Sequence, residues 1–420
     1  LGIEFVDWLH VGHRYMHHFG LFGADMNGVS FSHYWLRWLA LGGDPDNLKF
    51  NAEAQAAYAG RFARTPVRAP ASMPRINYAF QFDAASYAQY LRRFAQKRGA
   101  RRVEGRIAAV RRDGESGLVE ALELADGRRI GGDFFIDCSG FRSLLIGEAL
   151  GAGFEDWSKW LPCTRAAAVP CERLARIEPY TRATARPAGW QWRIPLQHRT
   201  GNGYVFADSF LGEDQAAEAL LAALDAPATA DPRILRFTAG RRRQAWIGNC
   251  VALGLSGGFL EPLESTSIHL VQAGLSKLLA AFPNRRPDPV LIDHFNEEMA
   301  QLYDGVRDFI VSHYKLTRRD DGEFWRYCRS MTVPDSLAEK IELFERRGEV
   351  MPGRHEVFRE VNWFAVLYGQ GVVPKDYHPI ADAMSEDDLR LNLARIRSGI
   401  SKRVEALPPH EEFLRQCGAA

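Results

Sequence analysis

The chain has 420 residues, of which 46% are hydrophobic, and a formal net charge of +1 at pH 7. The length predicts two or three domains, and the hydrophobic share is enough to build a large core. The balanced charge and the lack of an 18-residue apolar run argue against nucleic acid, an anionic membrane surface or a membrane span as partner.

The first third of the chain predicts a helix, a strand meander and a buried strand, in that order. Asp83 is a good N-cap for a helix over 84–98, which ends at a glycine. Strands are expected at 106–110 and 118–124, where Asp-Gly turns follow. The run 134–138 is short and mostly apolar, with glycine on both sides, which predicts a buried central strand. This order suits an α/β core.

The next segments predict a separate sheet and then a helical region. Residues 190–210 read as two aromatic-rich strands, and the triplet Gly201-Asn202-Gly203 is a hairpin signal between them. After Val290 the apolar residues recur at helical spacing. A Pro- and Arg-rich stretch precedes them, so we divide the chain into 1–289 and 290–420.

The six cysteines form no C-x-x-C pair and show no zinc spacing, so we expect no metal site. Cys138 and Cys250 lie in apolar strand contexts and read as small core residues. This usage favours a reducing, cytoplasmic location.

The stretch from Asn249 to Gln272 carries the most chemical information. An apolar run at 251–253 enters a Gly-rich turn at 254–258, an acidic bend follows at 261–264, and Ser265-Thr266-Ser267 opens an apolar helix. A buried strand that ends in glycines and feeds a helix lets backbone N–H groups approach an anion or a cofactor. Taken alone, this pattern is more often a tight strand-to-helix connection than a site.

Two further segments accompany this turn. Residues 189–195 read GWQWRIP, and residues 133–143 read DFFIDCSGFRS. Together with GFLEPLEST at 258–266, they resemble the flavin-dependent halogenase family, of the tryptophan-halogenase type. The resemblance runs along the whole chain. It implies an α/β fold with a flavin-monooxygenase-like FAD-binding core, a substrate-side β-sheet and a helical C-terminal region.

The resemblance also implies an activity. That activity is the FADH₂-dependent chlorination or bromination, through hypohalous acid, of an electron-rich aromatic such as an indole or tryptophan. The cofactors implied are FAD, reduced by a partner flavin reductase, and chloride or bromide. Two alternatives stay open: a flavin-dependent aromatic monooxygenase, against which the WxWxIP signature argues, and an inactive fragment or binding module without flavin. A homodimer is a further open alternative.

One expected part of such a protein has no counterpart in the sequence. Flavoproteins of this class begin with a strand, a G-x-G-x-x-G turn and a helix, and no such fingerprint occurs here. The chain starts at Leu1 without a methionine, in a stretch that resembles a mid-domain segment. We therefore expect that an N-terminal dinucleotide-binding segment is missing, with the catalytic lysine of the family, and we expect poor flavin affinity.

The resemblance assigns catalysis to Glu264 and Ser265, and halide binding to the backbone N–H groups of Thr266 and Ser267. Aromatic halogenation needs a base that takes the ring proton, and a carboxylate suits that task. A structural alternative is that Glu264 is a first-turn glutamate favoured by the helix dipole, with Ser265 or Thr266 as an ordinary N-cap. Tryptophan-specific members of the family commonly have glycine where this chain has Ser267.

A second set of residues is implied to form a wall between flavin and substrate: Trp190, Trp192, Ile194 and Pro195. The alternative is that the two indoles simply pack one face of a strand. His17 and Phe19 resemble residues that line the aromatic substrate, although a histidine in a structural loop is nearly as good an interpretation. The resemblance also implies flavin contacts. They come from glycines, which permit close approach of the backbone, and from two polar neighbours: Asp137, Ser139, Gly140, Gly254, Gly257 and Gly258.

Overall fold

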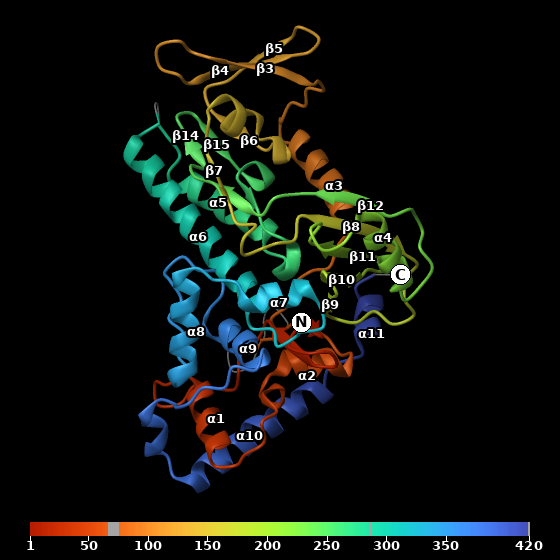
Figure 1. Cartoon of the computed structure of the whole chain (residues 1–420), viewed down its shortest axis with the longest axis vertical. Helices are drawn as coiled ribbons and strands as arrows, with labels where there is room; N and C mark the ends of the chain where they lie inside the picture. The colour runs from red at the N-terminus through yellow and green to blue at the C-terminus, as the bar shows by residue number, and fades with distance from the viewer. Residues whose placement is uncertain (66–74, 285–286, 419–420) are drawn as a thin grey trace.

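A seven-stranded sheet forms the centre of the computed structural model, which describes residues 1–65, 75–284 and 287–418 (Figure 1). Its strand order is β12-β8-β11-β10-β9-β1-β2. The first strand of the chain pairs antiparallel with β2 and parallel with β9. The bounds are β1 Gly2–Val6, β2 Arg14–His18, β8 Arg165–Cys171, β9 Thr181–Arg186, β10 Gly189–Pro195, β11 Thr200–Phe206 and β12 Arg233–Arg236.

The two aromatic-rich strands predicted at 190–210 are β10 and β11, which pair antiparallel. The predicted turn at Gly201-Asn202-Gly203 is wrong, because these residues lie inside β11 and the strands are joined by residues 196–199. Gly203 faces Trp192 across the pair, and a Cβ atom there would lie 2.0 Å from the indole ring. The glycine therefore makes room for a side chain rather than for a turn.

The predicted strand at 134–138 exists as β6 (Phe135–Asp137), but it is not central. It lies at the edge of a three-stranded sheet, in the order β14-β15-β6, and pairs parallel with β15 (Cys250–Ala252). No other described strand pairs with β6, so Ile136 is 46% exposed while its neighbours Phe135 and Asp137 are buried. The apolar composition predicted the strand correctly. It did not predict that the strand lies at a sheet edge, with one neighbouring strand instead of two.

The meander predicted from the Asp-Gly turns is confirmed and projects from one end of the molecule (Figure 1). It contains β3 (Ile107–Arg112), β4 (Val119–Leu124) and a third strand, β5 (Arg129–Gly131), which the sequence analysis missed. A further small sheet has the order β16-β13-β7. The remaining strands are β7 Phe154–Asp156, β13 Gly240–Arg242, β14 Trp246–Ile247 and β16 Gly258–Phe259.

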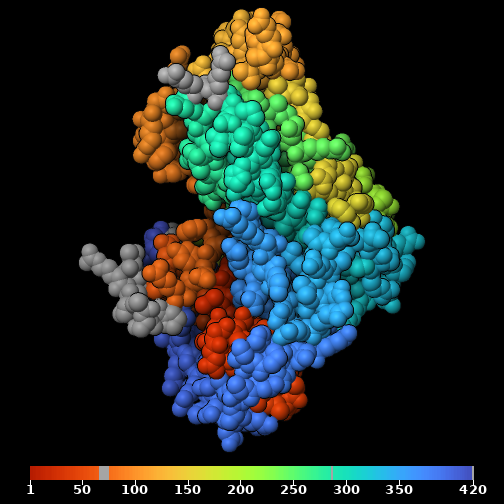
Figure 2. All heavy atoms as spheres, turned by 90° about the vertical axis from the view of Figure 1, so that its left-hand side faces the viewer, coloured from red at the N-terminus to blue at the C-terminus, as the bar shows by residue number. Residues whose placement is uncertain are grey.

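The helix expected at 84–98 is α3 (Ala84–Gln96), and the Asp83 side chain accepts the Ser86 N–H at its start. Its apolar stripe contains Tyr87, Tyr90, Leu91 and Phe94, yet none of the residues of α3 is buried. In Figure 2 this segment, in orange, stands at the outer surface above a hollow. Helical spacing therefore predicted the helix but not the packing of its apolar face.

The C-terminal region is helical, as predicted, and its longest helix reaches the centre of the molecule. Helix α6 (Pro289–Lys315) carries Phe295, Met299 and Val306 into the same core as Trp246 and Leu253 of the preceding region. The division of the chain at residue 289 stays a prediction. The other helices are α1 Phe31–Ala40, α2 Ala52–Ala59, α4 Glu213–Ala222, α5 Ser267–Ala280, α7 Glu323–Ser330, α8 Asp335–Arg347, α9 Glu360–Gly369, α10 Glu386–Glu405 and α11 His410–Gln416.

Candidate active site

The predicted strand–turn–helix is present between β15 and α5. The chain leaves β15, passes one 3₁₀ turn at Gly254–Ser256, the short strand β16 and a second 3₁₀ turn at Pro262–Glu264, and then enters α5. Gly258 packs closely, because a Cβ atom there would lie 2.8 Å from the carbonyl oxygen of Gly240. The connection is therefore both a tight turn and the carrier of the acidic residues.

Helix α5 begins with unusual backbone geometry. Ser265 joins the second 3₁₀ turn to the helix with φ 55° and ψ 33°, the left-handed conformation that non-glycine residues rarely adopt. Thr266 is the N-cap, but its side chain makes no capping hydrogen bond. Within the described chain, the N–H groups of residues 266–269 have no acceptor. The start of a 14-residue helix with free donors suits an anion.

The conformation of Ser265 can be tested by substitution. We expect Ser265→Val to lower the free energy of unfolding by about 2 kcal/mol, because a β-branched residue is strained at positive φ. Ser265→Asn is the matched control, since asparagine tolerates this region and should change stability by less than about 0.5 kcal/mol. Urea unfolding followed by fluorescence would measure both. Equal losses in the two variants would contradict a backbone origin.

Glu264 is held between two histidines and is almost fully buried. Its Oε2 lies 2.7 Å from Nδ1 of His17, and its Oε1 lies 2.9 Å from Nε2 of His313, a close contact that does not have hydrogen-bond geometry. The side chain is 1% exposed. Burial opposes its ionisation, but the contacts with His17 and then with His313 outweigh burial and lower the pKa of Glu264 to about 2. The carboxylate is therefore ionised at neutral pH.

The tautomer of His17 follows from its second partner. Nδ2 of Asn362 lies 3.0 Å from Nε2 of His17, while Oδ1 of Asn362 accepts the N–H of Arg359 at 2.8 Å. The amide orientation is fixed by that N–H, so Nε2 of His17 accepts and its Nδ1–H donates to Glu264. The Nδ1–H of His17 thus orients the carboxylate.

His313 extends the network on the other side. Its Nδ1 lies 2.6 Å from the hydroxyl of Tyr15, and its ring stacks on Phe5 with centroids 4.4 Å apart. Burial lowers the pKa of His313, against the opposing effect of Glu264. The sequence analysis missed His313, Tyr15 and Asn362, because they lie in an apolar helix, a strand and a helix start with no recognisable motif. Only their distance from Glu264 identifies them.

The WxWxIP residues lie on β10, and three of them share one face at alternate positions. The rings of Trp190 and Trp192 are 6.0 Å apart, and Trp190 is fully buried. The Trp190 indole N–H donates to Oε2 of Glu261 at 2.5 Å. Packing and a possible wall are compatible, so the role of this segment, with Ile194 and Pro195, stays a prediction.

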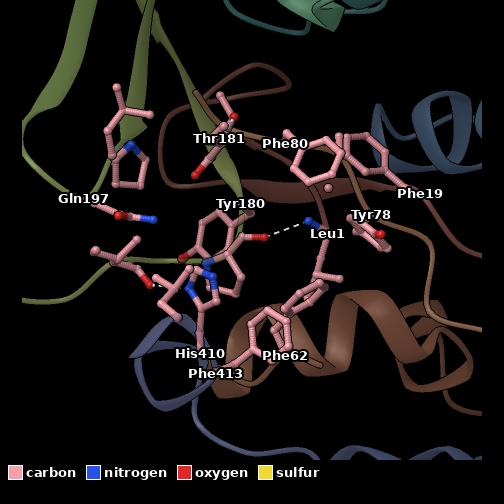
Figure 3. Close-up of a pocket in the computed structure, with 18 of the residues that line it drawn as sticks. Leu1, Phe19, Phe62, Tyr78, Phe80, Tyr180, Thr181, Gln197, His410 and Phe413 are labelled. Atoms are coloured by element: carbon pink, nitrogen blue, oxygen red, sulfur yellow. Dashed lines mark hydrogen bonds between the residues drawn. The ribbon is translucent and has the colours of Figure 1, made fainter. Parts of the chain in front are cut away.

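A cavity of about 450 Å³ adjoins the turn (Figure 3). Three of the predicted residues line it, namely Phe19, Pro195 and Ser265, whereas His17 and Glu264 do not. The amine of Leu1 also faces it and donates to the carbonyl of Pro179 at 2.7 Å. Five further lining residues are aromatic: Phe62, Tyr78, Phe80, Tyr180 and Phe413.

The predicted flavin residues come from two distant segments that lie side by side. The carbonyl of Asp137 accepts the N–H of Leu253 at 3.0 Å and also the hydroxyl of Ser256. The Asp137 carboxylate itself is used within its own loop, where it accepts the N–H and hydroxyl of Ser139 and two further N–H groups. The carboxylate therefore fixes the shape of this loop, and its role in a cofactor site stays a prediction.

The surface beside these loops is open and partly apolar. Gly140 and Gly254 have φ of 78° and 68°, and a Cβ atom at Gly140 would meet nothing within 4 Å. Phe141 and Leu255 are 47% and 42% exposed. Open space, apolar side chains and glycine backbone together suit the ring of a flavin. The roles of Gly140, Gly254, Gly257 and Gly258 stay predictions.

The family model described as tryptophan halogenase matches residues 1–386 of the chain. A tryptophan 7-halogenase of Lentzea aerocolonigenes is 35% identical, over 99% of this chain and 84% of that protein. The solved structure of a flavin-dependent halogenase from Xanthomonas campestris has a TM-score of 0.95 and 46% identity, covering 99% of this chain and 83% of that one. A flavin-dependent halogenase from Brevundimonas sp. BAL3 has a TM-score of 0.95 and 45% identity, covering 99% and 85%. The chain therefore belongs to the tryptophan halogenase family.

Membership confirms the resemblance and the α/β fold that it implied. The chain is an enzyme, a flavin-dependent halogenase that acts on aromatic compounds with reduced FAD, supplied by a flavin reductase, and a halide. The comparisons do not support the expected loss of an N-terminal segment, which stays a prediction. No described helix is long and apolar enough to cross a membrane.

Proposed function

We propose that this enzyme halogenates an indole-type ring, free or in tryptophan, with Glu264 as the base and the first amides of α5 as the halide site. The observation that carries the proposal is the pairing of an ionised, buried carboxylate with free N–H groups that begin two residues along the chain, at Thr266. The relatives named as tryptophan halogenases support the substrate class.

The halide would lie against the N–H groups of Thr266 and Ser267. These donors need no reorganisation, because the left-handed Ser265 and the missing side-chain cap leave them open. When bound, reduced FAD reacts with O₂ and supplies the oxidising power that makes the halide electrophilic. The exposed Phe141 and Leu255, beside the glycine turns, would hold the flavin.

The ring proton leaves after the halogen has added to the arene. The C–H bond breaks, its electron pair restores aromaticity, and Glu264 takes the proton. Each carboxylate oxygen has two lone pairs, so Oε1 can accept this proton while the N–H of His17 still bonds to Oε2. For this step the buried Oε1 has to leave its contact with Nε2 of His313. A weak base is sufficient, because the halogenated ring cation is a strong acid.

The cavity suits an aromatic substrate. Its lining includes six Phe and Tyr rings, and Phe19, Pro195 and Ser265 connect it to the wall segment and the turn. Stacking of an indole against such rings contributes about 1 kcal/mol for each favourable pair. We therefore place the substrate here, next to Ser265. Glu264 does not line the cavity, so it can take the ring proton only after its side chain turns towards the substrate.

Product analysis tests this function. The full chain would be supplied with FAD, NADH, a flavin reductase, O₂ and indole, with and without bromide. We expect bromoindole only when bromide is present, detected by mass spectrometry from its isotope pair. A hydroxylated product that does not depend on bromide would favour the monooxygenase alternative. A chain that neither shifts the FAD spectrum on titration nor forms product would favour a binding module.

Cellular location and assembly belong to the same proposal. All six cysteines are free, which supports a reducing cytoplasm. A homodimer and the division at residue 289 remain proposals with no direct support. Sedimentation analysis of the full chain would decide the first, and limited proteolysis near the start of α6 would decide the second.

A further inference from the structure

A second buried carboxylate lies in the same turn as Glu264. Glu261 is 1% exposed, and its Oε2 accepts two hydrogen bonds, from the indole N–H of Trp190 at 2.5 Å and from the hydroxyl of Tyr314 at 2.6 Å. Its Oε1 is buried and has no partner among the described residues. One oxygen thus connects the turn with β10 and α6.

Helix α6 contacts both carboxylates through consecutive residues. His313 faces Glu264, and Tyr314 donates to Glu261. Trp8 packs against the rings of Trp190 and Tyr314, at centroid distances of 6.4 and 5.3 Å. Because this surrounding is aromatic and buried, the Trp190 N–H depends on Glu261 for its hydrogen bond.

The two carboxylates are driven towards opposite charge states. Burial raises the pKa of Glu261 to about 7, against the opposing effects of Tyr314 and Trp190, whereas the histidines keep Glu264 ionised. The other titratable groups that face Glu261 are Tyr314, Cys163 and Cys328, and burial raises the pKa of each. Glu261 is therefore the member of this group that changes charge near neutral pH.

We propose that Glu261 is a positioning residue that locks Trp190, and with it the WxWxIP segment, against the turn that carries Glu264 and the free amides of α5. The hydrogen bond between Glu261 and Trp190 is independent of the proposed function, whereas its effect on halogenation rests on that function. A wall fixed to the turn keeps a constant path between the flavin side and the cavity. When the lock is removed, Trp190 moves, and oxidant is lost to solvent instead of reaching the arene.

The lock is tested on the chain alone by the indole N–H resonances of ¹⁵N-tryptophan-labelled protein. The Trp190 signal is assigned by its loss in Trp190→Phe. We expect it to move with pH around 7 in the native chain, to stay present but independent of pH in Glu261→Gln, and to shift or broaden in Glu261→Leu. Glu342→Gln, an exposed glutamate, is the matched control and should leave the native titration unchanged. A Trp190 signal that titrates equally in Glu261→Gln would overturn the lock.

The effect of the lock on halogenation is tested by the fraction of consumed NADH that appears as halogenated product. Released hydrogen peroxide is measured in parallel. We expect Glu261→Leu to lower this fraction at least 5-fold and Glu261→Gln to restore most of it. If Glu261→Leu does not fold, Tyr314→Phe, which removes the second donor to the same oxygen, takes its place with a loss of about 2-fold. A displaced Trp190 signal with an unchanged fraction would overturn the proposal. If the native chain forms no product, the proposed function fails while the resonance test still decides the lock.

Discussion

Replacement of Glu264 by glutamine is expected to lower the rate of halogenation by about 100-fold or more, the range found when a positioned base is removed. Glutamine preserves size and one oxygen, but it cannot hold the ring proton. Its amide N–H groups would also face the donor nitrogens of His17 or His313, so its orientation would be less fixed. The initial rate of bromoindole formation at saturating bromide and flavin would measure the effect.

The control is Glu342→Gln, which changes an exposed glutamate on α8 and should leave the rate within about 2-fold.

The pKa of Glu264 supplies an independent measurement. Because it is lowered in the folded chain, its contribution to stability is complete above pH 4.5 and is lost as the pH falls towards 2. The Gln variant should lack this part of the acid dependence. A variant with native halogenation would eliminate Glu264 as the base.

Asp137→Ala is expected to lower the free energy of unfolding by about 4 kcal/mol. The carboxylate is buried and accepts four hydrogen bonds, from the N–H and hydroxyl of Ser139 and the N–H groups of Leu145 and Ile146. Truncation leaves those donors without partners, and each unsatisfied buried group costs about 1–3 kcal/mol. Urea unfolding followed by tryptophan fluorescence would measure the loss.

Asp133→Ala is the matched control, since this exposed aspartate lies four residues earlier and should change stability by less than about 0.5 kcal/mol. A second expected result separates loop shape from direct cofactor contact. Asp137→Asn keeps one carbonyl oxygen and should retain part of both the stability and the FAD affinity. If Asp137→Asn lost all FAD binding but no stability, Asp137 would contact the cofactor directly.

Local patterns predicted the elements that carry the chemistry, because they depend on residues close together in the sequence. The glycines at 254–258 and the Ser-Thr-Ser cluster at 265–267 gave the turn and the start of α5 correctly. Asp83 gave the start of α3, and the spacing of apolar residues after Val290 gave the helical character of the C-terminal region. In each case a turn, a cap or a period is enough to define the element.

The environment of those elements could not be predicted in the same way. Glu264 is 247 residues from His17 in the chain, and Asn362 is 345 residues from His17. No periodicity connects such positions, which meet because β2, α6 and α9 pack into one core. Gly203 shows the same limit: its composition suggested a turn, but the indole of Trp192 explains it.

The contact of α6 with both acidic side chains restricts how the helix can change in length. Each residue of an α-helix turns the next one by about 100° and advances it by about 1.5 Å. A single-residue insertion between Phe295 and His313 would therefore rotate the ring at 313 away from Glu264 and the phenol at 314 away from Glu261 together. Variation in this helix should accumulate before its buried half or beyond Lys315, and indels inside it should be selected against more strongly than substitutions on its exposed side.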